Sequence, residues 1–69
     1  MPSDYGKGSV AVTERGQLFI TLGRFNGADS GWYGIGFNGE RVVATQPEFL
    51  ARNLNAYLLQ LANEEHGHA

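Results

Sequence analysis

Residues 31–39 read GWYGIGFNG, and this stretch decides between two folds. Its last six residues, 34–39, spell G-x-G-x-x-G, the pattern of phosphate-binding loops that lie between a strand and a helix. Here the apolar residues alternate up to Phe37, as in a strand, and Asn38-Gly39 is a strong hairpin signal. Another strand-like run follows at 41–45. The sequence therefore predicts a β-hairpin here instead of a nucleotide-binding loop.

The residues before this hairpin extend it into a meander. Alternating apolar residues predict two earlier strands, over 9–14 and 17–25, and turn-forming residues separate them from each other and from the strand at 32–37. We therefore expect four antiparallel strands in chain order.

The apolar spacing then changes from two residues to 3.6, which is typical of an amphipathic helix. Thr45, Pro47 and Glu48 fit a capping box, so this helix is expected to follow them and to run to about Asn63 or Glu65. The predicted fold class is α+β, a four-stranded antiparallel meander sheet followed by one C-terminal helix lying across one sheet face. Its expected extent is 9–65, with a flexible arm at 1–8 and a disordered tail at 66–69.

Length and composition narrow the class of protein. The chain has 69 residues, which is room for one domain with a modest core. It has no cysteine, so disulfides and thiolate metal sites are excluded, and oligomerisation or very tight packing must supply the remaining stability. The net charge of −2 does not suggest a strongly basic nucleic-acid binder. Without a visible signal peptide or an apolar run long enough to span a bilayer, we expect a cytoplasmic protein with no membrane partner.

The predicted sheet has two unlike faces. Tyr33, Ile35 and Phe37 are expected to face the helix, which leaves Phe19, Phe25 and Trp32 on the opposite face. Small residues lie between these aromatic residues, notably the two strand glycines of the motif. Glycines within a strand mark either a bend or bulge, or the close approach of a ligand or another backbone.

A bare aromatic face of this kind suits nucleic-acid bases, which stack on aromatic rings. The lead hypothesis is a non-catalytic protein that binds single-stranded nucleic acid, with Phe19, Phe25 and Trp32 as the stacking platform. Its candidate phosphate contacts lie at strand ends and turns, with Lys7 in the arm as a further one. These candidates are Arg15, Arg24 and Arg41.

Burial of the same face by a protein is the alternative, because exposed apolar patches often mark protein interfaces. In that case the chain is a small protein-interaction module, such as a phage-type inhibitor or an assembly adaptor, that uses this face or the acidic helix. Phe49 and Leu59 fall together on the outward side of the predicted helix. This pair favours a homodimer.

Catalytic and metal-binding patterns are weak in this sequence. No His, Ser or carboxylate residues converge in the pattern that acid–base or nucleophilic chemistry needs, so a non-enzyme without a cofactor is expected. His66 and His68 follow Glu64 and Glu65 in the tail, an arrangement open to weak binding of a divalent ion. Chain ends are usually disordered, however, so no metal site is predicted.

The chain resembles the positive-cofactor-four-like transcriptional coactivators and their bacterial and phage relatives over roughly residues 9–62. Three stretches carry the resemblance: VTERGQLFITLGRFNG as the first hairpin and its exit, WYGIGF as the third strand, and VVATQPEFLARNL as the fourth strand leading into the helix. The second strand of such relatives often exits through an aromatic-Asn-Gly sequence, as residues 25–27 do here. The resemblance implies a small dimeric protein that binds single-stranded DNA on its sheet. The family's usual Lys and Arg on the third and fourth strands are sparse here, where Gly34 and Gly36 occur instead.

Overall fold

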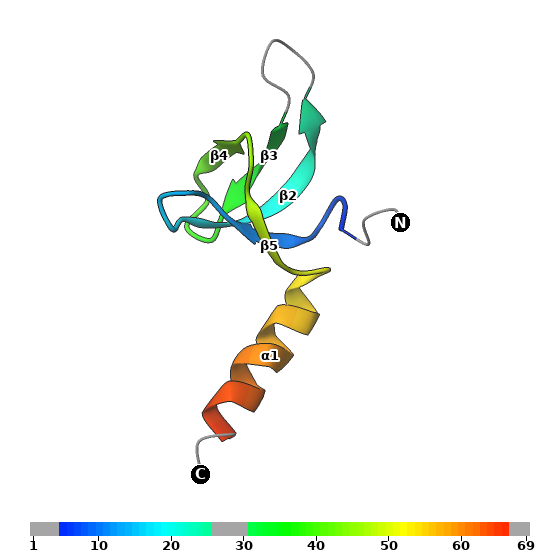
Figure 1. Ribbon diagram of the computed structural model, residues 1–69, viewed down its shortest axis with the longest axis vertical. Coiled ribbons are helices and arrows are strands. Elements are labelled where there is room, and N and C mark those ends of the chain that lie inside the picture. The colour runs from blue at the N-terminus through cyan, green and yellow to red at the C-terminus, as the bar shows by residue number, and fades with distance from the viewer. Residues whose placement is uncertain (1–4, 26–30, 67–69) are drawn as a thin grey trace.

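The computed structural model of the protein describes residues 5–25 and 31–66, and it shows one antiparallel sheet and one helix (Figure 1). The predicted α+β class and the C-terminal helix are confirmed, but the sheet has five strands instead of four. The elements are β1 (Val10–Val12), β2 (Leu18–Phe25), β3 (Gly31–Gly36), β4 (Arg41–Ala44), β5 (Glu48–Ala51) and α1 (Leu54–His66). The strand order in the sheet is β4-β3-β2-β1-β5, so the last strand pairs with the first.

The predicted hairpin between β3 and β4 is present. The Gly39 N–H donates to the Gly36 carbonyl at 2.9 Å, and the Gly36 N–H donates to the Glu40 carbonyl at 2.7 Å. Gly39 has φ +89°, whereas no non-glycine residue among those described has a positive φ. The turn is therefore a type I turn closed by a glycine bulge, since a type I′ turn also needs a positive φ at Asn38. The β1–β2 turn repeats this arrangement around Gly16, whose φ is +87°.

The predicted capping box is wrong, because residues 48–51 form the additional strand β5. Phe49 lies opposite Ala11 of β1 and packs against the core, and this burial favours the strand over the first turn of a helix. The cap lies further along the chain, where the Asn53 side-chain oxygen accepts a hydrogen bond from the Ala56 N–H at 2.7 Å. The helix consequently begins at Leu54.

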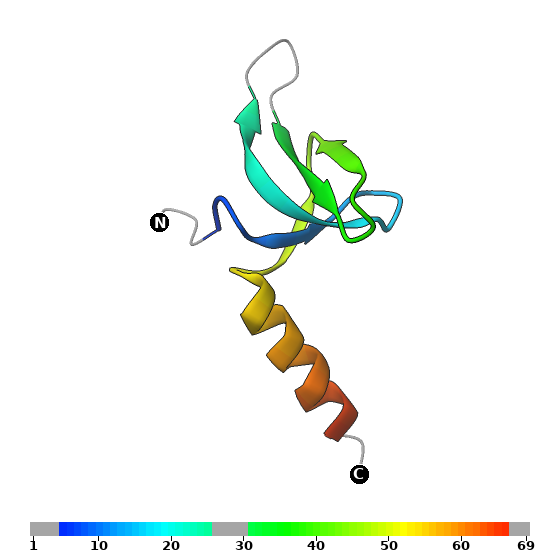
Figure 2. The same cartoon turned by 180° about the vertical axis from the view of Figure 1, so that it is seen from behind.

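The main core cluster lies on the inner face of the sheet, which was predicted to be bare, while Val10 and Ala51 are buried on the other face. Strand pairing places Ala11, Phe19 and Val42 on this inner face, and all three are buried. Phe49 of β5 and Ala44 of β4 pack against them from the two edge strands. The sheet is strongly bent, as Figure 2 shows from behind, so its own edges help to cover the inner face. Phe19 is 0% exposed at the centre of this core.

The helix does not lie across the sheet as predicted. Figures 1 and 2 show α1 extending away from the strands, and the Cα radius of gyration is 12.9 Å. A compact chain of this length would have about 11 Å. Two contacts tie the first half of α1 to the rest of the chain. The Tyr57 ring meets the Phe37 ring edge-on, with 6.3 Å between the ring centroids, and the Gln60 side-chain amide donates to the Leu50 carbonyl at 3.2 Å.

Residues 5–8 of the predicted arm are attached to the sheet by two buried hydroxyl groups. The Thr21 hydroxyl donates to the Gly6 carbonyl at 2.6 Å and accepts from the Ser9 N–H at 3.1 Å. The Ser9 hydroxyl donates to the Arg52 carbonyl at 3.4 Å, just before the helix. These bonds give both buried hydroxyl groups a partner. A buried hydroxyl without a partner would be costly, so the bonds contribute to stability. They also fix the point from which α1 leaves the sheet.

Candidate interaction surface

The predicted stacking platform does not form as an exposed surface. Phe19 is buried in the core. Trp32 is half-buried, and its ring meets the Phe49 ring edge-on, with 5.1 Å between the ring centroids. Tyr5 then stacks on Phe49 at 4.9 Å. Trp32, Phe49 and Tyr5 therefore pack on one another within the same chain, and Phe19 has no exposed face. The prediction that Phe19 and Trp32 share one face is confirmed, but that face is the interior.

Phe25 was assigned to the same face, and a β-bulge makes that assignment wrong. The pairing of β2 with β3 shifts between Thr21 and Gly23. One extra residue reverses the alternation, so Arg24 now lies opposite Trp32 on the inner face and Phe25 is on the other face. The Arg24 guanidinium consequently lies 5.3 Å from the centre of the Trp32 ring, a cation–π contact.

The three predicted phosphate contacts are exposed but do not converge. Arg24 lies near the end of β2, beside the segment 26–30, which is outside the described residues. Arg15 lies in the β1–β2 turn at the opposite end of the sheet, and Arg41 begins β4 opposite Ile35 on the outer face. Lys7 is exposed in the arm. The structure therefore does not bring the aromatic rings and the arginines into one site.

Two glycines of the G-x-G-x-x-G motif, Gly34 and Gly39, have structural roles. A Cβ added at Gly34 would collide with the carbonyl group of Ile20, the residue next to its partner on β2. At Gly36 an added Cβ would meet the Asn38 side-chain oxygen at 3.2 Å, a tight contact with a movable group. Gly39 provides the positive φ of the hairpin. The close approach of another backbone, one of the alternatives from the sequence, is confirmed at Gly34.

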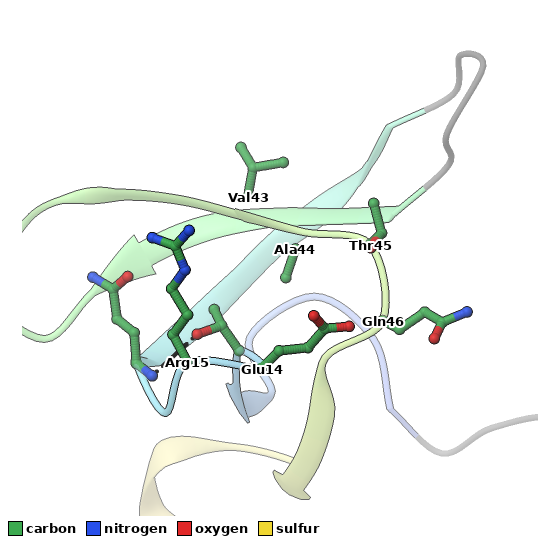
Figure 3. A pocket seen from close by; sticks show the side chains of 8 residues that line it. Glu14, Arg15, Val43, Ala44, Thr45 and Gln46 are labelled. Carbon is green, nitrogen blue, oxygen red and sulfur yellow. Dashed lines mark hydrogen bonds between the residues drawn. The ribbon is translucent and has the colours of Figure 1, made fainter.

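A polar hollow of about 340 Å³ lies between the β1–β2 turn and the connection from β4 to β5. Figure 3 shows Glu14 extending from the turn toward the segment of Thr45 and Gln46, whereas Arg15 extends in another direction. Among its lining residues there is one carboxylate and one guanidinium, with no histidine or second acid. This set does not supply the paired groups that acid–base chemistry requires.

The two residues of the predicted dimer interface do not share a surface. Phe49 belongs to β5 and packs between the Trp32 and Tyr5 rings, whereas Leu59 is exposed on α1. The prediction assumed that both lie on one helix, and the position of β5 removes that assumption.

A different surface is exposed because the helix leaves the sheet uncovered. Tyr33 and Val43 lie opposite each other on β3 and β4, on the outer face with Ile35. Figure 3 shows Val43 pointing to the opposite side of β4 from Ala44. We call the combined sheet and helix region the outer apolar surface. Its eight large side chains, between 38% and 64% exposed, are Leu22, Tyr33, Ile35, Phe37, Val43, Leu54, Leu58 and Leu61.

The outer apolar surface is continuous from the sheet to the helix. Leu22, Tyr33 and Val43 line one hollow of about 440 Å³, and Ile35 lines both this hollow and its neighbour. The neighbouring hollow is lined by Phe37 of the β3–β4 turn and by Leu54 at the start of α1. Leucines 58 and 61 continue from Leu54 at intervals of four and three residues, which places them on one side of the helix.

The sequence reasoning missed this surface because it placed the helix over the sheet. The signal that would have found it is Asn53 directly before Leu54, since Asn is a preferred N-cap residue. A helix beginning at Leu54 is separated from β4 by β5, so it no longer follows the turn that would fold it back across the sheet.

Across residues 5–25 and 31–66 there is no group of three or more His, Cys, Asp or Glu residues placed to hold a metal ion. Of the tail residues considered for weak ion binding, Glu64 and Glu65 are described, His66 is described for its backbone alone, and His68 lies outside the described residues. Within the described part of the chain, no helix has the length and apolar content needed to cross a bilayer.

No protein-family model, curated protein or solved structure matches this chain. The resemblance to positive-cofactor-four-like coactivators therefore stays a prediction, and the surface itself provides the basis for a functional proposal.

Proposed function

We propose that this protein is a non-catalytic protein-interaction module that binds a protein partner through its outer apolar surface. The observation that carries the proposal is the size and continuity of that surface. At about 200 Å² for a fully exposed large side chain, its eight side chains expose on the order of 700 Å². The largest apolar patch of an ordinary monomer is about 300–600 Å². One side of a standard protein interface buries about 800 Å².

The chemistry of the surface favours a protein over a nucleic acid. Nucleic-acid binding needs cations along the backbone path as well as rings for the bases. The outer apolar surface has two aromatic side chains, Tyr33 and Phe37, and Arg41 is the cation among the residues lining its hollows. Two carboxylates, Glu64 and Glu65, lie near the C-terminal end of α1, the helix that contributes to this surface. A mainly aliphatic surface with this charge balance suits an apolar protein surface.

Nucleic-acid binding is the competing hypothesis, and Trp32 and Arg24 are the candidate contacts that lie together in the structure. A titration with oligo-dT at low salt, followed by Trp32 fluorescence, separates the two proposals. We expect no quenching, because the Trp32 ring already contacts Phe49 and Arg24. Quenching that weakens as salt rises would support nucleic-acid binding instead.

The direct test compares surface variants as immobilised baits in a nuclease-treated extract of the cells that produce the protein. Val43→Ser and Leu58→Ser change the sheet part and the helix part of the surface, and Leu59→Ser is the matched control on the helix. We expect a bound protein that wild type and Leu59→Ser retain and that the other two variants lose. Equal retention by all four baits would contradict the proposal.

A further inference from the structure

The sheet part and the helix part of the outer apolar surface have complementary requirements: the helix lacks a surface to pack on, and the hollow on the sheet lacks a helix. Toward its C-terminal end, α1 has Leu61, which is 40% exposed, and Glu65, which is exposed. A helix of 13 residues is marginal in water unless one side packs against another surface. Meanwhile the hollow on the sheet, lined by Leu22, Tyr33 and Val43, has no side chain of its own helix among its lining residues.

The charges of the helix also favour a contact between its C-terminal end and another surface. Its first turn has no acidic residue, and Glu64 and Glu65 lie near its C-terminal end. Carboxylates are unfavourable there, because the carbonyl end of a helix has negative potential. A cation from elsewhere would relieve this repulsion.

Arg41 is such a cation. It lines the hollow on the outer face, and within residues 5–25 and 31–66 it has no ion-pair partner. Glu65 lies seven residues after Leu58 and four residues after Leu61, so all three are on the same side of the helix. A helix that places those two leucines in the hollow therefore has a carboxylate on the side that faces Arg41.

From these observations we infer that the partner of the outer apolar surface is a second copy of this chain. Each copy places α1 in the outer hollow of the other, with Leu58 and Leu61 against Tyr33 and Val43, and Glu65 beside Arg41. This inference rests on the proposed function and names its partner. One chain carries both the helix and the hollow, so the contact is reciprocal and closes as a two-fold dimer. The exposed apolar area of about 700 Å² per copy approaches the roughly 800 Å² per partner of a standard interface.

Sedimentation equilibrium of the full chain measures the dimer dissociation constant. We expect Leu58→Ser to raise this constant at least tenfold and Leu59→Ser to change it less than twofold. The two residues are neighbours on one helix and both are exposed, so the comparison isolates the side of the helix that faces the partner. Circular dichroism of each variant checks that the fold is retained.

The charge pair provides a test that only contact between copies can pass. At low ionic strength, Arg41→Glu and Glu65→Arg each place two like-charge pairs in a homodimer, and each should weaken it about tenfold. A mixture of the two variants contains a heterodimer in which both pairs have opposite charges. We expect this mixture to dimerise within about threefold of wild type.

Several results would overturn this inference. A wild-type chain that stays monomeric at high micromolar concentration rejects the second copy as the partner. A dimer that Leu59→Ser disrupts and Leu58→Ser does not would place the interface on the other side of the helix. Failure of the mixed variants to recover dimerisation would show that Arg41 and Glu65 do not meet between copies.

The same experiments separate this inference from the proposed function. A monomeric chain that still retains a different protein through Val43 and Leu58 keeps the function and rejects the dimer. A monomeric chain whose baits all behave alike rejects both.

Discussion

Replacing Gly34 by alanine tests whether the G-x-G-x-x-G motif is structural. The added Cβ would collide with the carbonyl oxygen of Ile20 and would lie 2.8 Å from the carbonyl carbon and 3.0 Å from the Phe19 ring. Neither backbone nor buried ring moves easily, because both belong to the packed centre of the sheet. Gly36 is the matched control two residues away on the same strand. Its nearest neighbours would be the Asn38 side chain at 3.2 Å and the Gln17 and Val42 side chains at 3.4 Å, and a distance of 3.4 Å is an ordinary van der Waals contact.

We expect Gly34→Ala to lower the free energy of unfolding by about 3 kcal/mol or more. This value is at the upper end of the range for overpacked sites, because the atoms that the new Cβ meets belong to the backbone. A chain of 69 residues has a total stability of about 3–10 kcal/mol, so this loss would consume a large part of it. Gly36→Ala should stay within about 1 kcal/mol of wild type, since the movable neighbours can shift and alanine is better suited than glycine to a strand.

Urea unfolding followed by Trp32 fluorescence measures both variants. With a slope of about 1–1.5 kcal/mol per molar urea for a small domain, the midpoint of Gly34→Ala should fall by about 2–3 M. Equal midpoints for the two variants would refute the close-approach explanation. A phosphate-binding role would give another result, in which Gly34→Ala abolishes nucleotide binding without loss of stability.

Three further substitutions test the local assignments. Asn53→Ala should remove about 1 kcal/mol by deleting the helix cap, whereas Asn55→Ala, exposed in the same turn, should remove much less; circular dichroism during urea unfolding compares them. Phe49→Ala should lower the free energy of unfolding by about 3 kcal/mol in the same assay, because the Phe49 ring packs on the core and on Trp32. A loss under about 1 kcal/mol would mean that β5 does not pack on the sheet through Phe49. Gly39→Ala should cost about 1 kcal/mol in thermal unfolding, since alanine is strained at φ +89°, and an unchanged midpoint would contradict the turn geometry.

The sequence by itself determined the local elements of this protein. Side-chain alternation and the Asn38-Gly39 signal predicted the hairpin, because a turn that needs one left-handed residue depends only on its own few residues. The same reasoning predicted a C-terminal helix and placed Phe19 and Trp32 on one face of the sheet. These features follow from the periods of the strand and the helix, which are properties of short stretches.

Tertiary structure alone decided which face of the sheet is inside. Residues 48–51 are compatible with a helix locally, but pairing with β1 and burial of Phe49 make them a strand. That strand moves the helix away from the sheet, turns the predicted binding face into the core and leaves the β3–β4 part of the other face exposed. The bulge at Leu22 likewise moved Phe25 to the opposite face, because the register of a strand is set by its partner. Such choices depend on contacts between residues far apart in the chain, and local patterns do not encode them.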